Sequence, residues 1–195
     1  MNIPASLSFE PTSITASQGD QIPVDILIYS GNDSVISTDV YITYDPQLLE
    51  VTERIDGGDL FQSVGVKQIA PGKAYVYGIN IDIAQAKPAQ GTIARIYFQA
   101  LSAGTTKLQI DCVPFSEQTS QIVSQQEELT NIIHCDSTRT HTSTMTISGD
   151  TVLGVSTQNT VSQYQWHIGA VLLVAILTAT LYMRYRKLTK EILSQ

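Results

Sequence analysis

Short runs of alternating apolar and polar residues fill the first 150 residues of this chain, and Gly, Pro, Asn or Asp separates one run from the next. No long amphipathic helix pattern interrupts them. Short strands between regular turn signals are typical of an antiparallel β-sandwich. The sequence therefore predicts an all-β domain over residues 1–149. Its nine predicted strands are 5–11, 13–18, 21–30, 37–45, 48–55, 73–81, 92–101, 106–113 and 143–149.

The segment 38–51, TDVYITYDPQLLEV, shows the alternation clearly. Successive side chains of an extended chain point to opposite faces of a sheet. One face is predicted to enter the core, and it comprises Thr38, Val40, Ile42 and Tyr44. The other face is predicted to meet solvent, and it comprises Asp39, Tyr41 and Thr43. Asp45 and Pro46 then end the strand, because Asp favours turns and Pro has no N–H for a sheet hydrogen bond.

A different signal lies near the C-terminus, where residues 151–183 contain no Asp, Glu, Lys or Arg. Within them, 166–183 is nearly all apolar and, extended to Tyr185, reaches the roughly 20 residues that a membrane-spanning helix needs. Aromatic and basic residues flank it, as they do at membrane interfaces. These are Trp166, Tyr182, Arg184, Arg186 and Lys187. We predict a transmembrane helix over 166–185, and the alternative is a buried core helix.

Charge is unevenly spread along the chain. Up to residue 150 there are 7 Lys or Arg against 17 Asp or Glu, a net charge of −10. After residue 183 there are 4 Lys or Arg against 1 Glu, a net charge of +3. Because basic residues stay on the cytoplasmic side, the pattern predicts a single-pass protein of the cell membrane with an extracellular domain and a cytoplasmic C-terminus. The acidic domain argues against nucleic acid as a partner, since phosphate binding needs clustered cations.

Residues 1–20 contain neither the basic nor the apolar run of a signal peptide. We expect an upstream signal sequence to export the domain. The alternative is a tail-anchored protein whose domain remains in the cytoplasm. Residues 150–165, uncharged after Asp150 and rich in Ser, Thr and Gln, predict a flexible linker, and 186–195 predicts a short basic tail.

The segment 116–136 is less regular than the rest of the domain. Ile122 and Val123 indicate a short strand, and 125–129 indicates a turn of helix. Cys112 and Cys135 flank most of this segment. An even number of cysteines in an exported domain favours one disulfide bond, worth about 3 kcal/mol on the chain-entropy model. The alternatives are two buried thiols, or a metal site with His134, Asp136 and His141 that lacks the spacing of a zinc site.

The order of several motifs resembles that of a cohesin domain of type I. These motifs are GDQIPVDILI, TDVYITYDPQLLEV, QGTIARIYFQAL and SAGTTKLQI, followed by a closing strand. The resemblance covers residues 7–149 and implies a nine-stranded jelly-roll sandwich that binds protein. Cohesins receive dockerin modules of other polypeptides, and the calcium of such a pair belongs to the dockerin. The Cys pair, the segment 116–136 and Ser37, where the family often has Asn, depart from the family pattern.

The resemblance also implies where a partner binds. The receiving surface is one flat sheet face formed by the strands that match 37–44, 73–81, 92–100 and 106–113. An aromatic ring beside a charge is a common interface anchor, although any sandwich has an outer face with some exposed Tyr. The candidate partner-binding residues are Ser37, Asp39, Tyr41, Thr43, Tyr75, Tyr77, Arg95 and Tyr97.

The chain contains no GxSxG, HExxH or Gly-rich phosphate motif, so neither an enzyme nor a cofactor is predicted. The leading hypothesis is a membrane-anchored module that captures a dockerin-like protein. The alternative is a carbohydrate-binding or adhesive jelly roll with a surface polysaccharide as its partner, and a third is a structural subunit of a surface complex. Asn32-Asp33-Ser34 also fits an N-glycosylation sequon.

Overall fold

The computed structural model describes residues 3–114, 116, 118–125 and 128–149. The predicted linker over 150–165, transmembrane helix over 166–185 and tail over 186–195 lie outside the described residues. Within the described ranges, no helix is long and apolar enough to cross a membrane. Residues 1–150 form one compact unit.

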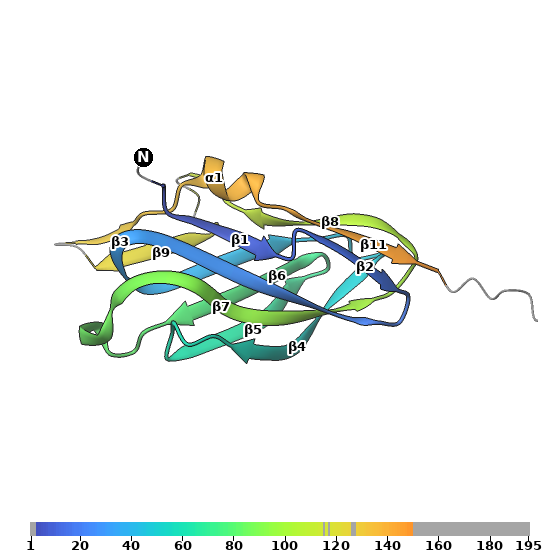
Figure 1. Ribbon diagram of the computed structural model, residues 1–195, viewed down its shortest axis with the longest axis horizontal. Helices are drawn as coiled ribbons and strands as arrows, with labels where there is room; N and C mark the ends of the chain where they lie inside the picture. Colours follow the sequence, from blue (N-terminus) through green and yellow to red (C-terminus); the bar gives the residue numbers. More distant parts are fainter. Residues whose placement is uncertain (1–2, 115, 117, 126–127, 150–195) are drawn as a thin grey trace, which may run out of the picture. The chain divides into compact units, whose positions relative to one another are not determined.

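Eleven strands, one α-helix and one 3-10 helix make up the described part of the chain (Figure 1). The helices are η1 (Ile83–Gln85) and α1 (Cys135–Thr140). The strands are β1 (Ser6–Glu10), β2 (Ser13–Ser17), β3 (Gln21–Thr43), β4 (Leu49–Gly57), β5 (Ser63–Ala70), β6 (Lys73–Ile79), β7 (Lys87–Ala100), β8 (Gly104–Asp111), β9 (Gln121–Gln125), β10 (Leu129–Asn131) and β11 (Ser143–Ser148).

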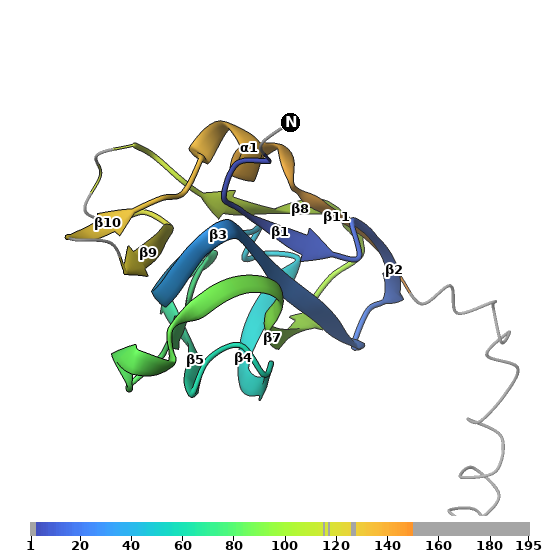
Figure 2. The ribbon, with the colours of Figure 1, turned by 60° about the vertical axis from the view of Figure 1, so that its left-hand side comes forward.

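The strands pack as two layers (Figure 2). In the first layer, residues 21–29 of β3 lie between β1 and β7, and β4 pairs with the other edge of β7. In the second layer, residues 35–43 of β3 lie between β6 on one side and β8 with β9 on the other, and β5 pairs with β6. β11 pairs with β8 and, in parallel, with β2. The all-β sandwich predicted from the sequence is confirmed.

β3 belongs to both layers because it bends near its middle. Its pairing with β7 shifts register between Tyr29 and Ser34, and Gly31 in this bend has a φ of 66°. Glycine adopts this left-handed conformation without the steric penalty of a Cβ atom. The sequence pattern predicts two strands here, 21–30 and 37–45. In the structure they are the two halves of one strand that passes from one layer to the other.

Alternating positions of both layers fill the interior. The four residues predicted to face the core in segment 38–51 are all buried, with Thr38 and Val40 at 0% exposure. Each buried Val or Ile side chain stabilises the fold by about 1.5–3 kcal/mol relative to exposure. In the first layer the buried side chains include Leu7, Phe9, Val24, Ile26, Ile28, Ile96 and Phe98. The same alternation directs the intervening side chains outward.

The predicted count of nine strands is wrong. β5, β9 and β10 add to it, and the fusion of two predicted strands into β3 subtracts from it. Ile122 and Val123 do lie in a short strand, β9. The predicted turn of helix over 125–129 is wrong, because Gln125 ends β9 and Leu129 begins β10.

Candidate partner-binding face

The outward residues of β9, β3, β6 and β5 form one sheet face, which we call the tyrosine face. Directly paired residues of antiparallel strands point to the same side, so the strand registers define rows across it. The central row is Gln121, Asp39, Tyr77 and Gly65. On one side of it lies the row Val123, Ser37, Ile79 and Ser63. On the other side lies the row Tyr41, Tyr75 and Lys67, which Asp111 of β8 extends.

The tyrosine rings pack against one another along this face. The ring centroids of Tyr41 and Tyr75 are 5.0 Å apart, and those of Tyr75 and Tyr77 are 6.1 Å apart. Both separations fall in the range of stabilising aromatic pairs, each worth about 0.5–1.5 kcal/mol beyond area burial. Tyr77 keeps 37% of its surface exposed. The rings therefore form a preorganised aromatic strip that a partner can cover.

Asp39 is tied to this strip by a hydrogen bond. The Tyr75 phenol donates to the Asp39 carboxylate with an oxygen–oxygen distance of 2.5 Å. The pKa of Tyr75 is raised, first by burial and then by the hydrogen bond to Asp39 and its negative charge. Because the phenol holds its proton, it stays a donor at neutral pH and keeps the Asp39 side chain directed toward β6.

Gly65 makes room for the exposed ring of Tyr77. A Cβ atom at position 65 would lie only 2.4 Å from Cε1 of Tyr77. Real Cβ atoms do not approach so closely, so any larger residue would push the ring away from β5. The ring lies over the glycine backbone, which keeps this part of the face flat.

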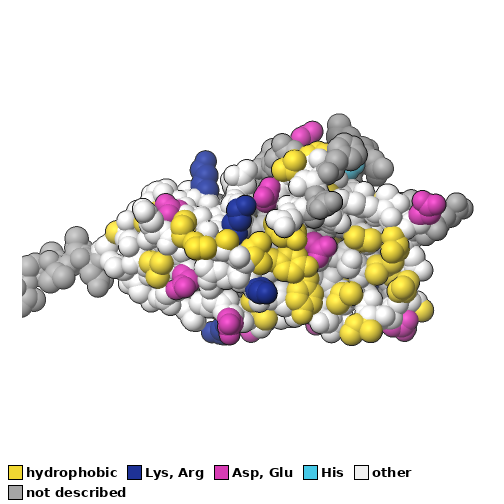
Figure 3. Space-filling view, turned by 180° about the vertical axis from the view of Figure 1, so that it is seen from behind, with side chains coloured by type: hydrophobic (Ala, Val, Ile, Leu, Met, Phe, Trp, Pro, Cys, Tyr) yellow, Lys and Arg dark blue, Asp and Glu magenta, His cyan; other side chains and the backbone are white. Residues whose placement is uncertain are grey.

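The tyrosine face changes character from one end to the other. At one end Ile79 is 39% exposed, and Ile81, just beyond β6, is 74% exposed. At the other end Thr43 and Lys73 pair beside Gln109 of β8. Figure 3 shows hydrophobic side chains gathered near the middle of this side of the molecule, with charged side chains at the margins of the group. A matching partner presents apolar groups at one end and polar groups at the other.

The predicted grouping of the strand over 92–100 with this face is wrong. That strand is β7, which pairs with the first half of β3 and with β4 and therefore lies in the first layer. Arg95 projects from the opposite side of the sandwich. There its guanidinium donates to both carboxylate oxygens of Asp25, at 2.7 and 2.8 Å. Arg95 therefore stabilises the contact between β7 and β3 and is remote from the tyrosine face.

Tyr97 shares the side of Arg95 and is only 8% exposed. Its phenol donates a short hydrogen bond to Asp56, and this bond is the main cause of its raised pKa. The guanidinium of Arg54 lies over the ring, 3.9 Å from its centroid. These contacts cover the ring and satisfy its hydroxyl, so Tyr97 connects β7 to β4.

β9 reaches the tyrosine face with the help of a disulfide bond. Cys112, at the end of β8, is bonded to Cys135, at the start of α1, and the Cα atoms are 5.2 Å apart. The 23-residue separation encloses β9 and β10. β9 supplies Gln121 and Val123 to the face. In the described residues, His, Cys, Asp and Glu side chains form no group of three or more that could hold a metal ion.

The sequence did not identify the contributions of β9 and β5. For β9 the only signal is the apolar pair Ile122 and Val123. For β5, SVGVKQIA, the alternation is weak because all of its residues are half-buried or exposed. Their positions beside β3 and β6 became visible only with the strand order.

Comparison with known proteins places this geometry in a family. The family model for the cohesin domain matches residues 7–140. A search of curated proteins finds no match. Among solved structures, the CaCohA2 cohesin of Clostridium acetobutylicum, in complex with CaDoc0917, is 18% identical, with a TM-score of 0.58, and the match covers 74% of this chain and 99% of that one.

Two further structures support the same fold. The sixth cohesin of scaffoldin B from Acetivibrio cellulolyticus, in complex with a mutant Cel5 dockerin, is 14% identical with a TM-score of 0.57, over 75% of this chain and 100% of that one. A non-cellulosomal cohesin from the archaeon Archaeoglobus fulgidus is 17% identical with a TM-score of 0.53, over 80% of this chain and 100% of that one. Cohesin domains are non-catalytic protein-interaction modules. The chain belongs to the cohesin domain family.

Proposed function

We propose that this cohesin captures a dockerin-type module of another polypeptide on its tyrosine face. The observation that carries the proposal is the exposed aromatic strip beside Asp39, on a flat sheet face whose side chains are already fixed by mutual contacts. Aromatic anchors with little remaining rotamer freedom lose little entropy when a partner binds. Solved cohesins with this fold are in complex with dockerins.

Calcium would belong to the partner in this complex. The face itself would contribute the Asp39 carboxylate, the tyrosine rings and the apolar group at Ile79 and Val123. A partner surface with a hydrogen-bond donor opposite Asp39 and aliphatic side chains opposite Ile79 would match it. We therefore expect the dockerin to lose affinity when calcium is removed, because its own fold would depend on the ion.

Membrane anchoring is a second part of the proposal. It rests on the apolar run over 166–185 and on the basic residues that follow it. In this arrangement the cohesin domain is extracellular, a linker over 150–165 joins it to the helix, and the C-terminus is cytoplasmic. The module would then hold its partner at the cell surface.

A retention assay tests the proposed partner. The full chain in detergent is immobilised and presented with a panel of dockerins, with and without a calcium chelator. We expect calcium-dependent retention of at least one dockerin. Retention of none, together with binding on a glycan array, would replace the proposal with the carbohydrate-binding alternative.

Protease accessibility tests the anchoring. In intact cells, external protease should degrade residues 1–150 and leave the C-terminal segment with the membrane after carbonate extraction. A domain that stays protected until the cells are lysed would contradict an extracellular location. A full chain that carbonate extracts would contradict the membrane helix.

A further inference from the structure

The sequence contains one Asn-x-Ser/Thr motif, Asn32-Asp33-Ser34. This motif is the acceptor for N-linked glycans in exported proteins, and its use requires an accessible Asn. Partner capture on the tyrosine face gives it no role.

The structure places this motif in the bend of β3. Pairing with β7 stops at Tyr29 and resumes at Ser34, so Asn32 falls in the gap between the paired stretches. Asn32 is exposed, and Gly31 before it turns the chain with a φ of 66°. The acceptor residue therefore lies on a surface bend rather than inside a paired strand.

The bend is held in shape without using the motif's reactive groups. The buried Ser30 hydroxyl donates to the main-chain oxygen of Asp33 at 2.8 Å and accepts from the Ala89 N–H at 2.8 Å. Among the described residues, neither the Asn32 amide nor the Ser34 hydroxyl has a hydrogen-bond partner. The amide that would carry a glycan is both fixed in position and unoccupied by internal bonds.

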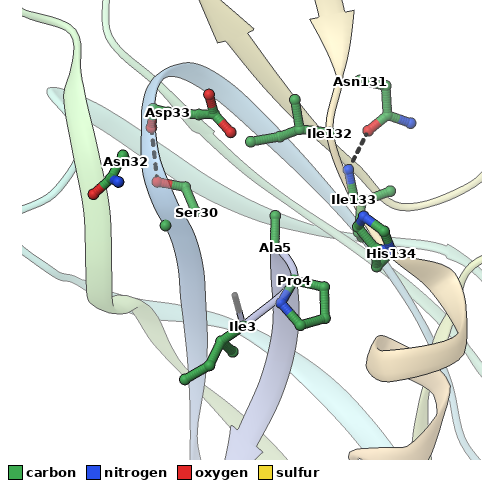
Figure 4. Close-up of a pocket in the computed structure, with 11 residues that line it drawn as sticks. Ile3, Pro4, Ala5, Ser30, Asn32, Asp33, Asn131, Ile132, Ile133 and His134 are labelled. Atoms are coloured by element: carbon green, nitrogen blue, oxygen red, sulfur yellow. Dashed lines mark hydrogen bonds between the residues drawn. The ribbon is translucent and has the colours of Figure 1, made fainter. Parts of the chain in front are cut away.

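A hollow lies directly beside Asn32. Its volume is about 460 Å³, which falls within the range of small-molecule sites. Figure 4 shows Asn32 on one side of it and Asn131 and His134 on the other, with Ile3 and Pro4 below. Amide and imidazole groups can hydrogen-bond sugar hydroxyls, and the Pro4 ring offers an apolar surface to a sugar face. The first sugars of an attached glycan have a polar place to rest.

We infer that Asn32 is an N-glycosylation site of this protein. The donor is an oligosaccharide linked through phosphate to a lipid. The Asn32 amide nitrogen forms a bond to the anomeric carbon of the first sugar, and the bond between that carbon and the lipid-phosphate oxygen breaks. The lipid phosphate leaves with the electron pair, and the amide nitrogen gives up one proton to a base of the transferase.

Mass analysis of the full chain, purified from the cells that naturally make it, tests this inference. We expect the proteolytic peptide with residues 32–34 to carry a saccharide mass on Asn32. The Ser34→Ala variant should lose that mass entirely although Asn32 is unchanged, and Ser34→Thr, which retains the motif, should keep it. Asn32→Gln provides a second unmodified form should Ser34→Ala fail to accumulate.

An unmodified Asn32 peptide from wild type would overturn the inference, as would a saccharide mass that persists in Ser34→Ala. The inference shares with the proposed function only the export of the domain. An unmodified Asn32 in a domain that external protease reaches would overturn glycosylation alone. An unmodified Asn32 in a protected domain would overturn glycosylation and the extracellular location together.

Discussion

The phenol of Tyr75 and the carboxylate of Asp39 are joined across the β3–β6 pair by a hydrogen bond of 2.5 Å at the centre of the tyrosine face. These residues do not lie directly opposite each other, since Asp39 pairs with Tyr77 and Tyr75 pairs with Tyr41. The bond is therefore diagonal and links two rows of the face. It makes Asp39 and the tyrosine strip one structural unit.

Replacing Tyr75 with Phe should separate the ring of Tyr75 from its hydroxyl. The ring contacts would remain, while the hydrogen bond to Asp39 would be lost, at a cost of about 1 kcal/mol in the free energy of unfolding. Tyr41→Phe is the matched control, because the Tyr41 hydroxyl has no hydrogen-bond partner among the described residues. Urea denaturation measures both variants. Equal destabilisation by the two changes would contradict the assigned bond.

Replacing Gly65 with Ala should change the shape of the face more than its stability. The new Cβ atom would displace the Tyr77 ring, which is partly exposed and can rotate away. We expect weaker partner binding with a change in unfolding free energy below about 1 kcal/mol. In a Tyr77→Ala background, Gly65→Ala should have no further effect on binding, and a double-mutant cycle measures this coupling. Additive effects of the two changes would show that Gly65 acts without Tyr77.

The raised pKa values of tyrosines predict a loss of stability in alkaline solution. The pKa of Tyr75 is raised by burial and by Asp39, and that of Tyr44 is raised mainly by burial. The folded state therefore favours the protonated phenols. Their stabilisation is complete below the unfolded pKa of about 10 and is lost as pH rises above it. Denaturation between pH 8 and pH 11 should show this decline, with a smaller decline for Tyr75→Phe. A wild-type curve that stays level above pH 10 would contradict it.

Reduction of the Cys112–Cys135 bond should destabilise the domain by about 3 kcal/mol, because the bond closes a loop of 23 residues. Hydrogen exchange should rise first in β9 and β10, which lie within that loop. Mass analysis with and without reductant should reveal two added hydrogens. Alkylation of both cysteines in the native, unreduced protein would show that the bond is absent.

Much of the fold follows from local pattern. The buried and exposed positions of segment 38–51 alternate as predicted, because one buried face fixes the register of a strand. β5 was missed for the opposite reason. Its outer edge is unpaired and Gly65 and Lys67 interrupt its apolar positions, so burial imposed little pattern on it.

The assignment of residues to the two faces depends on strand order, which local pattern does not contain. Tyr75 and Tyr97 both lie on strands with outward-facing tyrosines, yet β6 and β7 pair with different halves of β3. The sharp bend at Gly31 separates those halves. Arg95 and Tyr97 were therefore predicted for the correct surface class but lie on the opposite side of the sandwich.

The affinity of a retained dockerin for variants of the two faces tests the central claim most directly. The full chain is titrated in a calorimeter as wild type, as Asp39→Ala combined with Tyr41→Ala, and as Arg95→Ala. We expect the double variant to lose at least about 2 kcal/mol of binding free energy, as truncation of central anchors does, without unfolding. Arg95→Ala, on the opposite side, should bind as wild type does. Unchanged affinity of the double variant, or a loss confined to Arg95→Ala, would contradict partner capture on the tyrosine face.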